Sequence, residues 1–261
     1  MARSIPGPLY FERQGAVGTP MLFIHSTPDD HRLWLFQTAR FSAWYRTIAV
    51  DLAGYGRSPA PQDGLTLADH AAACWEAVDC VSDGGIIIQG NSVGSQVAMH
   101  MAAEQPRRVL AMIISGTGYP PPREPTARWK QRYEKEGIAP RREQIIDHFA
   151  PAAQKQPHLQ YYADMLLELN NASTASSIVA TNQALMNAPG EEFYLGLSVP
   201  TLIVSGTEDR SRPGAFELQK RIKGAELESI EGAGHACNIE APAEYDAHCI
   251  RFLKTRGLFP G

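Results

Sequence analysis

Short apolar runs recur along the chain, and they constrain its fold more than any other feature. Each run has five or six residues, which suits a strand buried on both faces. Segments of helical periodicity separate the runs. Strands that alternate with helices form a mostly parallel sheet covered on both faces, so we expect an α/β fold. The runs are MLFIH (21–25), TIAVD (47–51), GIIIQG (85–90), LAMIIS (110–115) and TLIVSG (201–206).

The stretch LTLADHAAACWEAVDCV (65–81) is the clearest of the helical segments. Thr66 is followed three residues later by Asp69, and this spacing resembles a capping box at the start of an amphipathic helix. The pattern therefore predicts a helix that begins at this threonine.

Length and charge limit the class of protein. A chain of 261 residues can form one large α/β domain with a substantial core. Hydrophobic residues make up 44%, charged residues 20%, and the net charge is -4, a composition typical of neither a disordered segment nor a polyanion-binding protein. We therefore expect no nucleic-acid partner.

Membrane and redox signals are also absent from the sequence. No apolar run is long enough to cross a bilayer, and the start MARSIPGPLY lacks a continuous apolar segment, so we expect no membrane attachment and a cytoplasmic location. The cysteines form no C-x-x-C pair and no metal-ligand spacing, which favours free thiols over a disulfide or a metal site. They are Cys74, Cys80, Cys237 and Cys249.

The alternation of strand and helix stops after a proline cluster, ISGTGYPPPREP. Residues 118–198 have helical character and no convincing strand, so we expect a helical cap inserted between two parts of the core, 1–117 and 199–261. Its aromatic residues either shape a pocket or fill the cap's own core. Its basic residues, in RWKQRYEKEG and PRREQ, form either a solvated helix face, which we favour, or a clamp for an acidic substrate.

Ser92 lies in GNSVG, between a predicted strand and a predicted helix. A turn this sharp brings the strand and helix backbones close together, which explains glycine at positions 90 and 94. The strained turn would raise the Ser92 hydroxyl above the sheet, at a helix N-terminus that favours negative charge. An N-cap serine is the simpler interpretation, and a nucleophile would require a histidine base and a carboxylate.

Both partners are available after later strands. Asp209 follows the run TLIVSG, and His235 lies in the loop GAGH after another strand-like run. The order Ser92, Asp209, His235, each directly after a strand, predicts a nucleophile, acid and base in one site. Glu208, Glu231 and His100 are alternatives that lie less naturally at a strand end.

With these motifs, the chain resembles the α/β-hydrolase fold family over nearly its whole length, from FIHSTPDDHRLW to GHACNIEAPAEYDAHCIRFL. The segment DLAGYGRS (51–58) resembles the acidic, glycine-rich loop after the family's fourth strand. GTEDR and GAGH are similar to its acid and base segments. The resemblance implies a helical cap and a serine nucleophile. Relatives that cleave halides or epoxides have an aspartate at the turn, so Ser92 argues against both reactions.

The resemblance also implies an oxyanion hole. HSTP (25–28) corresponds to the family's His-Gly-x-Pro loop, which assigns one backbone amide to Thr27 and the second to Val93. Ser26 stands where the family has glycine, and its side chain would either restrict the backbone or add a donor. Ser95 likewise replaces a second glycine that many relatives have.

We therefore expect a serine hydrolase that cleaves a small or medium carboxylic ester or lactone through an acyl-enzyme. Two alternatives stay open: hydrolysis of a carbon-carbon bond in a diketone-type substrate, and ligand binding without catalysis. The chain has no Walker loop, G-x-G-x-x-G or H-E-x-x-H, so we expect a small-molecule substrate, no cofactor and no metal. The sequence leaves a homo-oligomer open.

Overall fold

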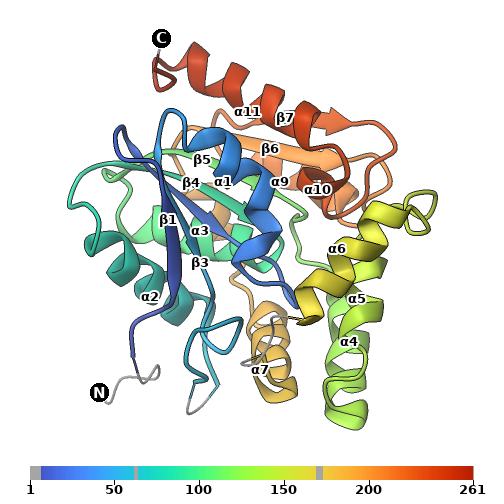
Figure 1. Cartoon of the computed structure of the whole chain (residues 1–261). Coiled ribbons are helices and arrows are strands. Elements are labelled where there is room, and N and C mark those ends of the chain that lie inside the picture. The colour runs from blue at the N-terminus through green and yellow to red at the C-terminus, as the bar shows by residue number, and fades with distance from the viewer. Residues whose placement is uncertain (1–6, 62–63, 169–172, 261) are drawn as a thin grey trace.

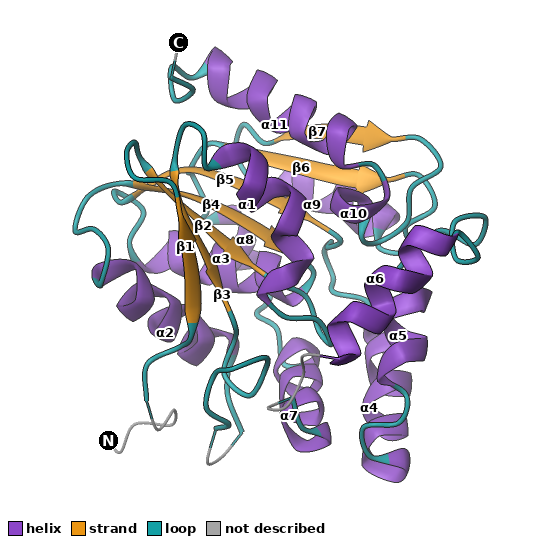
Figure 2. Ribbon diagram, in the orientation of Figure 1, coloured by secondary structure: helices purple, strands orange, loops and turns teal. Residues whose placement is uncertain are grey.

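The computed structural model describes residues 7–61, 64–168 and 173–260. Its centre is a seven-stranded sheet in the order β1-β3-β2-β4-β5-β6-β7, in which only β1 is antiparallel to its neighbour (Figures 1 and 2). The strands are β1 (Phe11–Gln14), β2 (Pro20–Ile24), β3 (Arg46–Val50), β4 (Ile86–Asn91), β5 (Val109–Ser115), β6 (Thr201–Gly206) and β7 (Glu226–Ile230).

The five apolar runs predicted as strands correspond to β2, β3, β4, β5 and β6, which confirms the α/β prediction. The strand-like run before His235 forms β7. β1 has no counterpart among the predicted strands, because FERQ contains one apolar residue and its side chains are half-buried or exposed. This strand forms by hydrogen-bonding with the free edge of β3.

Helices cover both faces of the sheet, and each face has its own apolar core. Side chains alternate along each strand, so Leu22 and Ile24 enter one core while Met21 and Phe23 enter the other. One face carries α2 (Leu67–Asp79), α3 (Val93–Glu104) and α9 (Arg212–Arg221). The opposite face carries η1 (His31–Trp34), α1 (Leu35–Phe41), α10 (Cys237–Glu240) and α11 (Pro242–Thr255).

α2 begins as predicted, one residue after Thr66. The Thr66 hydroxyl accepts a hydrogen bond from the Asp69 amide at 3.1 Å, and the Asp69 carboxylate accepts one from the Thr66 amide at 2.8 Å. The capping box is confirmed.

Five helices lie between β5 and β6, and the described part of 118–198 contains no strand. They are α4 (Arg123–Glu136), α5 (Arg141–Asp147), α6 (Pro157–Glu168), α7 (Ala175–Met186) and α8 (Glu191–Leu195). α4 to α7 lie beyond one end of the sheet (Figure 1). Apolar side chains of α4, α7 and α8 join one core, and those of α5 and α6 join the other. The division into a core and a cap stays a prediction.

Within the described residues, every helix is too short or too polar to cross a membrane. Residues 1–6, on which the expectation about the start of the chain partly rests, lie outside the described residues. The four cysteines are free thiols.

The turn from β4 to α3 brings three backbone segments into contact. A Cβ atom on Gly90 would lie 2.5 Å from the Gly94 carbonyl oxygen. A Cβ atom on Gly94 would lie 2.1 Å from the carbonyl oxygen of Ile24, at the end of β2. Both distances are far below van der Waals contact, and the obstructing atoms are backbone atoms that cannot rotate away.

We predict that Gly94→Ala lowers the free energy of unfolding by about 3 kcal/mol, since β2 or α3 must shift to admit the methyl group. Urea denaturation measures the change. Gly190→Ala is the matched control, because a Cβ atom at that position meets nothing within 4 Å. Equal stability of the two variants would contradict the close approach.

Candidate active site

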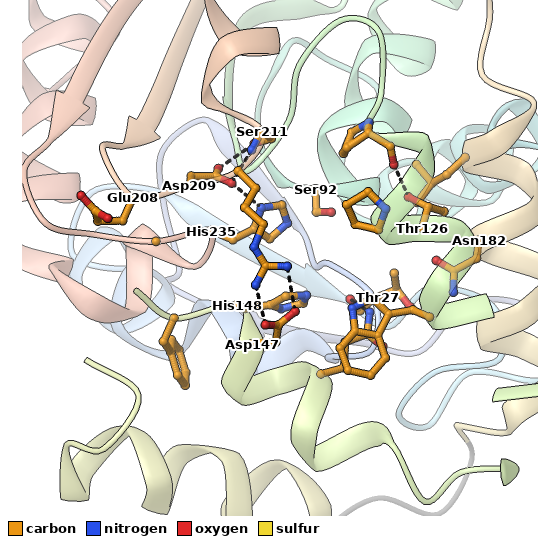
Figure 3. A pocket seen from close by; sticks show the side chains of 18 of the residues that line it. Thr27, Ser92, Thr126, Asp147, His148, Asn182, Glu208, Asp209, Ser211 and His235 are labelled. Atoms are coloured by element: carbon orange, nitrogen blue, oxygen red, sulfur yellow. Dashed lines mark hydrogen bonds and ion pairs between the residues drawn. The ribbon is translucent and has the colours of Figure 1, made fainter. Parts of the chain in front are cut away.

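The loops that follow four parallel strands meet at one cavity of about 260 Å³ (Figure 3). Thr27 follows β2, Ser92 follows β4, Asp209 follows β6 and His235 follows β7, and all four line the cavity. The carboxyl ends of parallel strands are where open α/β sheets assemble their sites. The fold therefore brings together residues that lie up to 208 positions apart, from 27 to 235.

Ser92 has the backbone strain that the sequence predicts. Its φ of 55° makes it the one non-glycine residue with positive φ in the described chain. The hydroxyl of Ser95 donates to the carbonyl oxygens of Gly90 at 2.9 Å and Ser115 at 2.8 Å. A serine in place of the second glycine is thus accommodated, because its hydroxyl ties α3 to the ends of β4 and β5.

Asp209 and His235 form a hydrogen-bonded pair. His235 Nδ1 lies 3.0 Å from Asp209 Oδ1, and the aspartate side chain is 1% exposed. Ser211 donates to the same carboxylate from its amide at 2.9 Å and from its hydroxyl at 2.6 Å. Both carboxylate oxygens of Asp209 therefore accept hydrogen bonds, and the carboxylate in turn fixes the orientation of the imidazole.

The pair shifts both pKa values. Burial raises the pKa of Asp209, but the His235 charge and the hydrogen bonds from His235 and Ser211 outweigh it, so the pKa is lowered. Burial lowers the pKa of His235, but the charge and hydrogen bond of Asp209 outweigh it, so the pKa lies above its ordinary value of 6.5. The pair favours an imidazolium beside a carboxylate.

Asp209, His235 and Ser92 follow one another along the cavity (Figure 3). Within the described residues, no hydrogen bond joins the Ser92 hydroxyl to the His235 ring, although both side chains line the cavity. Because Nδ1 is bound to Asp209, Nε2 is the ring nitrogen left for a proton from the serine.

The loop after β2 contains Thr27, to which the resemblance assigns one oxyanion amide, and the neighbouring Ser26. Thr27 lines the cavity, and its hydroxyl forms a hydrogen bond with the Tyr55 hydroxyl at 2.8 Å. The Ser26 hydroxyl donates to Asp29. The Ser26 hydroxyl is therefore engaged within the loop, which argues against the expectation that it adds a donor to the oxyanion hole. Val93 begins α3, so its amide has no intrahelical acceptor.

The alternatives to Asp209 and His235 are less well placed, although Glu208 also lines the cavity. Glu208 is exposed and points away from His235 (Figure 3). Glu231 is exposed, and His100 lines a different cavity beside α2 and α7.

Three residues that the sequence did not single out hold the His235 loop. Asn91 Nδ2 donates to the His235 carbonyl oxygen at 3.1 Å. The His148 carbonyl oxygen, at the end of α5, accepts from the His235 amide at 2.8 Å. The Glu240 carboxylate accepts from the amides of Gly234 at 2.8 Å and Ala150 at 3.0 Å. No local motif marks these residues, because each of them makes a contact with a segment that is far away in the chain.

The side chain of His148 is also part of the cavity wall. Its ring lies 4.9 Å from that of His235, centroid to centroid, and its Nδ1 lies 3.7 Å from Asp29 Oδ2. A second imidazole therefore stands beside the first.

The helices between β5 and β6 complete the cavity wall. Both roles left open for the aromatic residues of 118–198 occur: Trp129 lines the cavity, Tyr133 and Tyr162 are buried in the two cores, and Tyr161 is 70% exposed. The basic residues mostly form exposed ion pairs, as the favoured interpretation predicts. Arg141 is an exception: it is 2% exposed and its Nε donates to the Pro28 carbonyl oxygen at 3.0 Å.

One group of described residues has the donor set for a metal, namely Asp30, His31 and Asp51. His31 Nδ1 is bound to Asp51 Oδ1 at 2.7 Å, and the guanidinium of Arg32 occupies both oxygens of Asp30. These contacts account for the group as an internal ion-pair network.

Comparison with known proteins is consistent with this geometry. The sequence profile described as "Alpha/beta hydrolase family" matches residues 21–247. This chain belongs to the alpha/beta hydrolase family.

Several known proteins resemble the chain over most of its length. It is 27% identical over 252 residues to the AB hydrolase superfamily protein YisY of Bacillus subtilis, covering 90% of this chain and 91% of the relative. It is 25% identical to the putative carbamate hydrolase RutD of Klebsiella pneumoniae, covering 79% and 80%. The enol-lactonase of Burkholderia xenovorans has a TM-score of 0.85 at 19% identity, with 96% and 98% covered.

In this alpha/beta hydrolase, the segment DLAGYGRS follows the third strand, β3, whereas the resemblance placed it after the family's fourth strand. The described part of the chain forms seven strands. His25 joins this segment to the loop of Thr27: its Nε2 accepts from the Leu52 amide at 2.9 Å and its Nδ1 donates to the Ser26 carbonyl oxygen at 2.7 Å. The two segments that resemble family motifs are therefore connected by one buried ring.

We predict that Asp209→Asn lowers the pKa of His235, because the carboxylate charge raises it in the intact protein. Proton NMR titration of the imidazole measures the pKa, with His235→Gln used to assign the signal. Glu208→Gln, which removes the neighbouring exposed carboxylate, should change this pKa much less. A larger effect of Glu208→Gln would show that the wrong acid has been assigned.

Proposed function

We propose that this alpha/beta hydrolase is a serine hydrolase that cleaves a small or medium carboxylic ester, or a lactone, through an acyl-enzyme. The observation that carries the proposal is the strained Ser92 on the wall of a cavity that also contains the hydrogen-bonded Asp209–His235 pair. A cytoplasmic location is part of the same proposal, supported by four free thiols.

In the first half of the proposed reaction, Nε2 of His235 takes the proton of the Ser92 hydroxyl as Oγ attacks the substrate carbonyl carbon. Asp209 orients the ring and stabilises the cation that forms. The carbonyl oxygen becomes an anion, which the backbone amides of Thr27 and Val93 bind. The anion then collapses, and the alcohol leaves with the proton that His235 returns.

In the second half, His235 takes a proton from water, and the resulting hydroxide equivalent attacks the acyl-enzyme. The same two amides bind the second tetrahedral anion, and Ser92 leaves with a proton from His235. The acid product is released. This sequence uses only groups of this chain and water.

A carbon-carbon bond hydrolase of a diketone-type substrate is the second candidate. The sequence GNS at the turn supports it, because several related enzymes of that type carry the same three residues. Comparing turnover of a vinylogous diketone with that of matched esters distinguishes the two reactions. A ligand receptor on the same fold would turn over neither.

We predict that Ser92→Ala abolishes covalent labelling by a fluorophosphonate and reduces hydrolysis of p-nitrophenyl esters by at least about 10³-fold. Gel-based labelling and initial rates measure the two effects. Ser95→Ala is a control at the same turn, since its hydroxyl faces backbone carbonyls rather than the cavity, and it should keep the labelling. Failure of the unaltered protein to react with the probe would favour the receptor.

We also predict that kcat/KM increases with pH through the pKa of His235, because only the neutral ring accepts the Ser92 proton. This pKa is raised in the folded protein, so the midpoint of the acidic limb should lie above 6.5. In Asp209→Asn, the limb should move to lower pH while kcat falls by about 10⁴-fold. A limb that stays in place would contradict the role of Asp209.

A further inference from the structure

Asn182, on α7, lies in the wall of the same cavity as Ser92 (Figure 3). The residue is only 2% exposed, yet its side-chain amide forms no hydrogen bond with any described residue, and Nδ2 is buried without a partner. Buried polar groups almost always have a hydrogen-bond partner. A molecule in the cavity would supply the partner that this amide lacks within the protein.

Gln144, on α5, contributes a second amide to the cavity wall. It is 3% exposed, and its Oε1 is buried without a partner. Its Nε2 lies 3.5 Å from the Thr27 carbonyl oxygen, at the limit for a hydrogen bond. Two neutral amides from two helices thus offer both donors and acceptors.

Apart from Glu208, the charged side chains that line the cavity are already paired. Arg210 Nη2 lies 2.5 Å from Asp147 Oδ1, and Asp209 is bound to His235. Glu208 is exposed to solvent. An anionic ligand would find no free cation among these groups, and a cationic ligand would find only the solvent-exposed Glu208, so the unpaired buried amides favour a neutral ligand.

The orientation of α7 is fixed independently of Asn182. The adjacent Thr181 is hydrogen-bonded to Tyr55, and Ile178 is buried in the core. Leu185 is three residues from Asn182, on the same helix face, and also lines the cavity. The Asn182 amide therefore lines the same cavity as the apolar side chains of Leu185 on α7 and Trp129 on α4.

We propose that the substrate carries a neutral group that both donates and accepts hydrogen bonds, a hydroxyl or a secondary amide, and that Asn182 binds this group, while Gln144 offers a second amide in the wall of the same cavity. The inference deepens the proposed serine hydrolase, on which it rests. It makes Asn182 a specificity-determining residue rather than a structural one.

The test compares esters that differ only in that group. p-Nitrophenyl N-acetyl-β-alaninate and p-nitrophenyl hexanoate have acyl chains of equal length, as do p-nitrophenyl 4-acetamidobutanoate and heptanoate. For the alcohol side, 2-acetamidoethyl butanoate is paired with pentyl butanoate. The readout is the ratio of kcat/KM for the amide ester to that for the alkyl ester.

In at least one pair, this ratio should be about tenfold lower in Asn182→Leu than in the unaltered protein, because leucine has a similar volume and no polar atoms. Gln183→Leu is the matched control. It removes an exposed amide from the neighbouring position of α7, and its ratio should stay unchanged. Since Asn182→Leu removes an unpaired buried amide, its melting temperature should not fall.

An unchanged ratio in every pair overturns the inference while leaving the proposed function intact. A lower melting temperature with equal losses on both esters of each pair would show a structural role and would also overturn it. Dissociation constants of methyl N-acetyl-β-alaninate and methyl hexanoate, measured by calorimetry on Ser92→Ala and on Ser92→Ala with Asn182→Leu, test the same preference without turnover. If the unaltered protein hydrolyses none of the esters, the proposed function fails, and this binding ratio still decides the inference.

Discussion

Contact between backbones at the turn from β4 to α3 is the constraint on which the rest of the site depends. Gly94 lies against the carbonyl group of Ile24, and the residues directly after Ile24 form the loop that contains Thr27. One contact therefore fixes both the strained Ser92 and the loop beside it. Their relative position is set by main-chain atoms, which cannot change rotamer, so the geometry is largely independent of side-chain packing.

The helix α5 extends this rigidity to the other side of the cavity. The His148 carbonyl oxygen binds the amides of His235 and Ala236, while Arg141 binds the carbonyl oxygen of Pro28. Movement of α5 would disturb both loops at once. Helix α7 contributes Asn182 through a side chain, and no main-chain hydrogen bond joins the described part of this helix to the His235 loop. Changes of specificity are thus more easily accommodated on α7 than on α5.

Local patterns in the sequence were sufficient for the features that depend on local physics. The apolar runs predicted five strands, Thr66 and Asp69 predicted the start of α2, and the glycines around Ser92 predicted the sharp turn. β1 was missed because hydrogen bonding to an edge, not apolar periodicity, makes it a strand. Arg141 and Asn182 were missed because their burial follows from packing between segments that are far apart in the chain.

The charges around His235 depend on which carboxylate Arg210 binds, Asp209 or Asp147, and the sequence alone does not settle this. Arg210 comes directly after Asp209 and would be a natural partner for it. Instead, its guanidinium binds Asp147 of α5 at 2.5 Å. Asp209 therefore accepts hydrogen bonds only from neutral donors of Ser211 and from His235, which keeps its charge directed at the imidazole. An arginine on this carboxylate would compete for that charge and lower the pKa of His235, so the pairing of Arg210 with α5 helps to keep the imidazole basic.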